Sequence, residues 1–211
     1  VTVAVRHGVT QHSVERRFSG SDGDHDPPLI QRGRDQAAAV AEELSRREAF
    51  DILVTSPMLR TRQTADIIGA RLGLEPVVVP GLQEARFGVW DGCTFAEVME
   101  RWPDEMAAWL SAPEVAPPGG ESLSELVSRV SAAMAQVIAS HRGSRILVTA
   151  HVGTIRSLVV AALGAPLSAM NRMELSPASI TTLSWYADGN ASLRTFAEAS
   201  HLESLAAHWT P

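Results

Sequence analysis

The sequence predicts an α/β fold, a three-layer α/β/α sandwich with a mostly parallel central sheet. Short apolar runs suited to buried strands alternate along the chain with longer segments of helical periodicity. Several of these runs end abruptly in charged or titratable residues, as strands do at the ligand-binding edge of such a sheet. The length of 211 residues and the 45% hydrophobic content fit one domain with a sizeable core.

Six segments have the pattern expected of strands. The predicted strands are Val1–Val5, Asp51–Thr55, Pro76–Val79, Arg145–Thr149, Ile180–Tyr186 and Ala191–Phe196. The last two flank the turn-forming sequence YADGNAS, so we expect them to form a hairpin-like pair.

Two of the intervening segments carry clear apolar stripes. One helix is expected from about Arg34 to Arg47, and a longer one follows Ser122, which forms a capping box with Glu125. The stripe residues are Ala37, Val40, Ala41 and Leu44 in the first helix, and Leu123, Leu126, Val127, Val130, Met134, Val137 and Ile138 in the second. Helices of this kind would cover both faces of the sheet.

The segment from Leu82 to Gly120 interrupts the alternation. It contains Trp90, Trp102, Trp109 and the turn sequence APPGG. We therefore expect a single domain over residues 1–211, with an insertion at about residues 82–120 that lies over one sheet edge and over the active site.

Composition narrows the classes of function. The formal net charge of −6 gives no general attraction to nucleic acid or to an anionic membrane, so an anion must be held by a local cluster of cations. The most apolar stretch, Ser157–Leu167, is far shorter than the ~20 residues of a membrane helix. Cys93 is the only cysteine, which excludes a disulfide framework and favours a cytoplasmic location. We expect neither membrane association nor direct nucleic-acid binding.

Reactive side chains follow the first four predicted strands. Arg6 and His7 follow the first, Arg60 begins a helix after the second, Glu84 follows the third and His151 follows the fourth. Two guanidinium groups and two imidazoles form a concentrated set of donors for a tetrahedral dianion and need no metal. A phosphate pocket fits these residues, in which one neutral histidine attacks phosphorus and a carboxylic acid protonates the departing oxygen.

The residues leave some assignments open. Glu84 is the candidate acid because of its place after a strand, but Asp91 and Glu97 compete with it. Arg60 is favoured over Arg62 for phosphate. His151 follows a buried strand, and the remaining histidines are expected to be exposed.

A metal hydrolase is a second class to weigh. The sequence SDGDHD at Ser21–Asp26 superficially resembles a metal-ligand cluster, although a Gly- and Pro-flanked acidic stretch is more often a solvated loop. We expect no metal and no cofactor, with this loop lining the mouth of the site.

The motifs resemble those of the histidine phosphatase superfamily, the phosphoglycerate mutase-like phosphatases. The family's opening motif Arg-His-Gly-x-Thr stands here as RHGVT, and it is followed in family order by RFSGSDGDHDPPLIQRGRDQA, SPMLRTRQTA, EARFGVWDG, PPGGES and AHVGTIR. The resemblance covers the chain from Val1 to about Tyr186. It implies that His7 is the nucleophile, that Arg6, Arg60 and His151 hold the phosphoryl group, and that Glu84 is the general acid. It also implies that the Ser19-Gly20 loop and the backbone after His151 face the substrate.

The chain departs from the family pattern at two positions. Ser13 stands where the family usually has Asn, and Val152 stands where it usually has Gly. Ser13 still offers one hydrogen bond but is shorter, and Val152 keeps its backbone N–H while it narrows the pocket. These two departures occur together with the motifs RRFSG, DGCTFAE and WYADGNAS. The combination is most similar to the phosphatase half of bacterial two-domain proteins, in which an acid phosphatase similar to α-ribazole phosphatases is fused to a ribonuclease H-type domain. The resemblance therefore implies such a domain as a candidate partner in the full-length chain.

The expected function is that of a metal-independent phosphomonoester hydrolase, an acid phosphatase, that works through a phosphohistidine on a small phosphorylated metabolite. Candidate substrates are α-ribazole phosphate, sugar phosphates and nucleotides. The alternatives are mutase-type phosphoryl transfer, for which the segment around Glu84 is short, and a non-catalytic phosphate-binding module. The oligomeric state is open, with a homodimer as the candidate assembly.

Electrostatics should set the protonation of the nucleophile. We expect Arg6, Arg60 and a protonated His151 to keep His7 neutral, with its second ring nitrogen fixed by a backbone carbonyl.

Overall fold

A mixed sheet of six strands forms the centre of the molecule. The computed structural model describes residues 1–21 and 25–206. The strands lie in the order β3-β2-β4-β1-β5-β6; the first four are parallel, and β5 and β6 run antiparallel to their neighbours. The strands are β1 (Thr2–Arg6), β2 (Ile52–Thr55), β3 (Pro76–Val78), β4 (Ile146–Ala150), β5 (Ile180–Trp185) and β6 (Ala191–Glu198). The expectation of a mostly parallel sheet is thus confirmed, and each predicted strand is present within two residues at either end.

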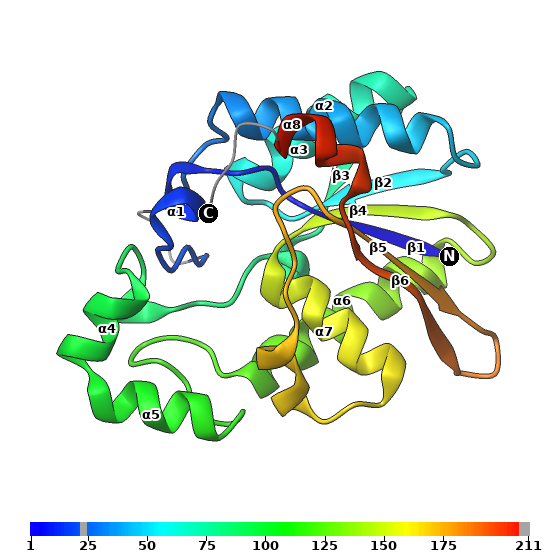
Figure 1. Cartoon of the computed structure of the whole chain (residues 1–211). Helices are drawn as coiled ribbons and strands as arrows, with labels where there is room; N and C mark the ends of the chain where they lie inside the picture. Colours follow the sequence, from blue (N-terminus) through cyan, green and yellow to red (C-terminus); the bar gives the residue numbers. More distant parts are fainter. Residues whose placement is uncertain (22–24, 207–211) are drawn as a thin grey trace.

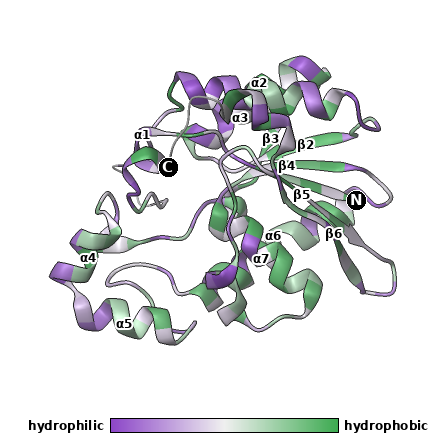
Figure 2. Cartoon of the chain, in the orientation of Figure 1, coloured by the Kyte–Doolittle hydropathy of each residue, from purple (hydrophilic) through white to green (hydrophobic). Residues whose placement is uncertain are grey.

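Helices cover both faces of the sheet (Figure 1). Two of them, α2 (Gln31–Ser45) and α3 (Leu59–Leu72), pack on one face, and α6 (Leu123–Ser140) and α7 (Val152–Leu163) pack on the other. Buried residues of each helix pair belong to the apolar cluster on that face, and Figure 2 shows hydrophobic residues along the strands and along α6 and α7. The remaining helices are α1 (Gln11–Glu15), α4 (Phe95–Arg101), α5 (Pro103–Ser111) and α8 (Glu203–Ala206), with short 3-10 helices η1 (Pro80–Leu82), η2 (Gly88–Trp90), η3 (Leu167–Arg172) and η4 (Ser200–Leu202).

The alternation of side chains along β1 separates the two cores. Val3 and Val5 belong to the apolar cluster under α2 and α3, whereas Ala4 belongs to the cluster under α6 and α7. All three are completely buried. A strand covered on both faces must be apolar throughout, which explains why the run before Arg6 contains no polar core residue except Thr2.

The second stripe helix begins as the sequence predicts. The Ser122 hydroxyl accepts the Glu125 N–H at 3.2 Å, and the Glu125 carboxylate accepts the Ser122 N–H at 2.8 Å. These two reciprocal bonds satisfy N–H groups that a helix start leaves unpaired.

The chain between η1 and α6 has a small core of its own. Trp90, Val98 and Met106 are buried there, and α4 and α5 stand beside the edge at which β1 ends (Figure 1). This arrangement supports the expected insertion, and we propose that residues 82–120 form one wall of the site described below.

Among the described residues, none of the helices has both the length and the apolar run needed to cross a membrane.

Helix α2 crosses the loop after β1 at a contact between two glycines. A Cβ atom on Gly8 would lie 2.2 Å from the Gly33 carbonyl oxygen, and a Cβ on Gly33 would lie 2.2 Å from the Val9 carbonyl oxygen. Both obstacles are backbone atoms, so neither can move aside cheaply. The two glycines therefore set how closely α2 approaches the segment that carries His7.

Gly33→Ala tests this contact because helix propensity and the backbone clash change the free energy of unfolding in opposite directions. Helix propensity alone would stabilise the variant by up to ~1 kcal/mol. The backbone clash should outweigh that gain, and we expect a net loss of about 1–3 kcal/mol in the free energy of unfolding, measured by denaturant titration. Ala38→Gly, at an exposed position of the same helix, reports propensity alone and should cost about 0.5–1 kcal/mol. A Gly33→Ala protein as stable as the wild type would contradict the account.

Candidate active site

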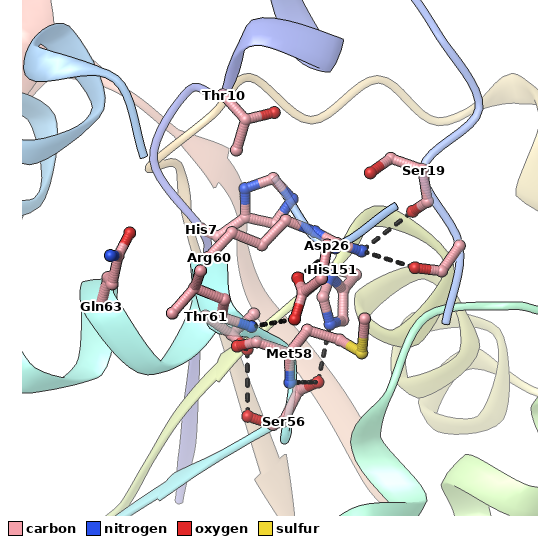
Figure 3. Close-up of polar contacts among 12 residues, drawn as sticks. His7, Thr10, Ser19, Asp26, Ser56, Met58, Arg60, Thr61, Gln63 and His151 are labelled. Atoms are coloured by element: carbon pink, nitrogen blue, oxygen red, sulfur yellow. Dashed lines mark hydrogen bonds and ion pairs between the residues drawn. The ribbon is translucent and has the colours of Figure 1, made fainter. Parts of the chain in front are cut away.

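The strand register brings the two predicted histidines together. Arg6 of β1 lies opposite Ala150 of β4, so the next residues, His7 and His151, leave the sheet side by side. The His7 N–H donates to the Ala150 carbonyl at 3.0 Å. The two ring centroids are 5.4 Å apart with an angle of 63° between the planes. Figure 3 shows both rings with Arg60 beside them.

The His7 ring is held through one of its nitrogens. Nδ1 lies 2.8 Å from the Gly8 carbonyl oxygen, and a carbonyl can only accept, so Nδ1 carries the proton. This is the backbone contact expected from the sequence. The Gly8 N–H in turn donates to Thr64 Oγ1 of α3 at 3.2 Å. In the neutral ring Nε2 is the nitrogen with a free lone pair, and His7 lines a cavity of about 370 Å³.

His151 is oriented by Ser56, which follows β2. Ser56 Oγ lies 2.7 Å from His151 Nε2 and accepts the Met58 N–H at 3.4 Å (Figure 3). The Ser56 hydroxyl can donate to Nε2, and we assign this direction. In that arrangement the proton of neutral His151 is on Nδ1, a buried atom that has no hydrogen-bond partner in the described part of the chain. The ring thus keeps one N–H for another group.

Two arginines are buried next to the histidines. Arg6 donates from Nη1 to the Leu175 carbonyl. Arg60, in the first turn of α3, is 1% exposed and donates to the carbonyls of Ser19 and Gly20 at 2.9 and 3.2 Å. Its Nη1 pairs with the Asp26 carboxylate at 3.2 Å. Asp26 also accepts the Leu59 N–H at 2.7 Å, so one carboxylate fixes both the helix start and the arginine.

Several buried polar atoms of this cluster have no hydrogen-bond partner among residues 1–21 and 25–206. They are Arg6 Nε, Arg60 Nε, His151 Nδ1 and Ser19 Oγ. A buried donor left unsatisfied costs about 1–3 kcal/mol, which a folded protein tolerates where a ligand supplies the acceptor. Three of the four atoms are N–H donors on cationic or imidazole groups. Such a set matches an oxyanion better than a neutral ligand.

The buried cations determine the charge of the imidazoles. Burial lowers the pKa of both His7 and His151 well below the ordinary value, and Arg60 and Arg6 lower it further. Burial also lowers the pKa of Arg6 to about 10 and lowers that of Arg60. Both histidines are therefore neutral when the cavity holds no anion. The expectation of a protonated His151 therefore does not hold for the anion-free cavity, in which burial and the neighbouring guanidinium groups lower the His151 pKa.

Glu84 enters the same cavity from the loop after η1. Its two carboxyl oxygens accept the N–H groups of Ala85 at 2.9 Å and of Gly153 at 3.0 Å. A Cβ on Gly153 would lie 2.3 Å from Glu84 Oε1, so glycine is needed at this position, one residue after Val152. Arg129 of α6 pins the loop by donating to the Gly81, Gln83 and Glu84 carbonyls at 2.9, 3.1 and 3.3 Å.

The competing carboxylates are placed elsewhere. Asp91 accepts the Gly20 N–H at 2.6 Å. Glu97 accepts the Thr94 N–H at 2.6 Å and pairs with Arg17 at 3.3 Å. Neither lines the cavity next to His7, so of the three candidates only Glu84 faces it.

Besides the arginines and His151, four residues were predicted to contact the substrate, and the structure places three of them in the cavity and one behind it. Ser13, Ser19 and Val152 line the cavity. The Ser13 hydroxyl is already engaged with Thr10 in the cap of α1, at 3.1 Å from Thr10 Oγ1. Gly20 gives its N–H to Asp91 and its carbonyl to Arg60, so it supports the cluster from behind.

The SDGDHD segment lies partly outside the described residues, at positions 22–24. His25 packs its ring 5.9 Å from that of His12, and Asp26 is paired with Arg60. Within residues 1–21 and 25–206 no group of three or more His, Cys, Asp or Glu side chains has the geometry to hold a metal ion.

Sequence reasoning missed four residues that shape the site. Ser56, Asp26 and Arg129 position the groups named above, and His12, which we expected to be exposed, is half-buried and lines the cavity. Ser56 and Asp26 lie inside motifs that the sequence analysis quoted, but their partners are 95 and 34 residues away along the chain. The register of β2 and β4 brings Ser56 to His151, and the fold of the loop before α2 brings Asp26 to Arg60.

Comparison with known proteins agrees with this geometry. The profile of the histidine phosphatase superfamily (branch 1) matches residues 2–198. A bifunctional protein of Mycobacterium tuberculosis is 37% identical over 198 residues, covering 94% of this chain and 54% of that protein. Phosphoserine phosphatase 1 of Hydrogenobacter thermophilus is 34% identical, covering 79% of this chain and 77% of the relative. The chain spans about half the length of the mycobacterial relative.

A solved structure shows the same fold with phosphate present. The mycobacterial glucosyl-3-phosphoglycerate phosphatase in complex with inorganic phosphate superposes with a TM-score of 0.82 at 30% identity, over 95% of this chain and 98% of that one. On the family profile, which spans most of the chain, and on these relatives, the chain belongs to the histidine phosphatase superfamily.

Proposed function

We propose that this domain is a metal-independent phosphomonoester hydrolase, an acid phosphatase, that forms a phosphohistidine on His7. The observation that carries the proposal is the buried cluster of two arginines and two neutral histidines, with unpartnered N–H groups on Arg6, Arg60 and His151. These donors can surround the three oxygens of a phosphoryl group and meet the charge that develops on them.

The first step follows from the state of His7. The Gly8 carbonyl holds the proton on Nδ1, so Nε2 is the atom that attacks phosphorus. As the N–P bond forms, the bond from phosphorus to the ester oxygen breaks, and protonated Glu84 gives its proton to that oxygen. The alcohol leaves, and the phosphoryl group stays on His7. His151, held by Ser56, donates its Nδ1–H to a phosphoryl oxygen throughout.

The second step restores the enzyme. Water attacks phosphorus, the Glu84 carboxylate accepts the water proton, and the N–P electron pair returns to Nε2. Inorganic phosphate is released. Because Arg6 and Arg60 supply the positive charge, no step in this scheme needs a metal ion.

The substrate and the wider context belong to the same proposal. A small phosphorylated metabolite fits a cavity of about 370 Å³ beside His7. A second domain in the full-length chain is supported by the 54% coverage of the bifunctional relative, and its ribonuclease H-type identity rests on the sequence resemblance alone. A cytoplasmic location rests on the cysteine content, with Cys93 free.

The assignment of His7 is tested by trapping the intermediate. His7→Ala should abolish turnover of p-nitrophenyl phosphate, and acid-free quenching of the wild type with a ³²P-labelled ester should leave a label that is acid-labile and base-stable. EDTA should not reduce wild-type turnover. Near-normal turnover in His7→Ala, or an acid-stable phosphoserine, would contradict the assignment. Release of inorganic phosphate, rather than transfer to a second hydroxyl, separates hydrolysis from mutase chemistry.

The assignment of Glu84 is tested by the leaving group. An alkoxide leaves poorly without a proton, whereas p-nitrophenolate leaves readily. Glu84→Ala should therefore lose about 10²–10⁴-fold in kcat with an alkyl phosphate and much less with p-nitrophenyl phosphate. Glu100→Gln is the matched control, since that exposed carboxylate lies outside the cavity. An equal loss on both esters in Glu84→Ala would remove it from the role of acid.

A further inference from the structure

The cavity beside His7 has a wall made of phenylalanine rings. Phe18, Phe87 and Phe95 are among the residues that line it. The Phe18 ring lies 4.9 Å from that of Phe87 and 6.4 Å from that of Phe95, and the Phe18 and Phe95 planes are only 25° apart. We call these three residues the aromatic wall. Phe95 is 47% exposed, although it sits beside a small core that buries Trp90 completely.

The aromatic wall is rigidly built. Phe95 is the first residue of α4, directly after the Thr94 cap, in which Thr94 and Glu97 exchange hydrogen bonds. The backbone of Phe18 pairs with the same segment, since its N–H donates to Cys93 at 2.8 Å and its carbonyl accepts from Gly92 at 2.9 Å. Arg17 adds a bond to the Gly92 carbonyl at 2.9 Å. Because these side chains are already held in place, a ligand that stacks on Phe95 would not have to immobilise them. Little binding free energy is therefore lost to side-chain ordering.

The polar groups near the aromatic wall are mostly engaged with other protein groups. Arg17 pairs with Glu15 and Glu97, and the Ser13 hydroxyl caps α1. Arg16 lines the cavity without a hydrogen bond or ion pair in the described part of the chain, but its side chain is exposed to water, which weakens its pull on an anion. Ser19 Oγ and His12 Nδ1 have no hydrogen-bond partner among the described residues. Apart from these two atoms, the aromatic wall offers a fixed surface that is apolar and planar.

We infer that the aromatic wall is the subsite for the leaving group, and that it selects phosphomonoesters whose alcohol carries a flat apolar ring. This inference rests on the proposed role of His7, because the phosphate pocket places one end of the substrate. An aryl or heteroaryl ring attached within a few atoms of the ester oxygen would stack on Phe95 and displace water from a half-exposed ring.

Two esters with leaving groups of similar acidity test the inference. 2-Phenylethyl phosphate and ethyl phosphate both release primary alcohols, so the ratio of their kcat/KM values reports ring binding rather than chemistry. We expect the wild type to favour the phenylethyl ester by at least about tenfold. Phe95→Ala should reduce that ratio by about fivefold or more, and Phe95→Tyr should keep it. Met99→Ala, at an exposed apolar position of the same helix outside the cavity, is the control and should leave the ratio as in the wild type.

Three results would each overturn the inference. The first is a ratio of kcat/KM values near one in the wild type, and the second is an equal loss of kcat/KM on both esters in Phe95→Ala. The third is a preference for the small anionic ester O-phosphoserine that Arg16→Ala removes, since this side of the cavity would then bind a second anion.

Failure of the proposed function gives a different result. In that case p-nitrophenyl phosphate is not hydrolysed and no phosphohistidine forms. The aromatic wall can still be tested by calorimetry. We expect the wild type to bind 2-phenylethylphosphonate more tightly than ethylphosphonate, and we expect Phe95→Ala to abolish this difference. Equal binding of the two phosphonates would contradict the inference without reference to turnover.

Discussion

The parallel pairing of β1 with β4 fixes the site, because it decides which side chains leave the sheet together. Arg6 pairs with Ala150, and the next residue on each strand is a histidine. The neighbouring pairing of β2 with β4, in which Thr55 lies opposite Thr149, then places Ser56 within reach of His151. A slip of one residue in either pairing would reverse the faces of the apolar side chains as well as separate these groups. Core packing and active-site geometry therefore depend on the same register.

The second constraint is the burial of two guanidinium groups in that place. Among the described residues, Arg60 is paired with one carboxylate, that of Asp26, and the Arg6 side chain donates to a backbone carbonyl. The result is a region of positive potential in which both imidazoles are neutral and several buried N–H groups have no partner among the described residues. These features cost stability in the free protein and favour binding of a dianion, so we interpret them as the physical basis of a phosphate pocket.

Much of this could be predicted from the sequence, for identifiable reasons. The run from Val1 to Val5 and the stripe after Ser122 have unambiguous periodicity, and strand ends in such folds converge at one edge, which grouped His7, Glu84 and His151 correctly. The partners of these residues could not be predicted. Ser56, Asp26 and Arg129 act through contacts between distant segments, and the charge of His151 depends on how deeply Arg6 and Arg60 are buried. Local pattern carries no information about either.

The central claim is that burial and the two neighbouring arginines keep His7 and His151 neutral, with their protons on Nδ1. The ¹⁵N and ¹H imidazole resonances of both residues, assigned with single His→Gln variants and followed from pH 8 to pH 5 without phosphate, test it directly. The account predicts that neither ring becomes protonated at the ordinary histidine pKa of about 6.5, because both pKa values are lowered well below it, and that Nε2 of His7 bears no proton. Titration of either ring near pH 6.5 or above, or a His7 proton on Nε2, would contradict it.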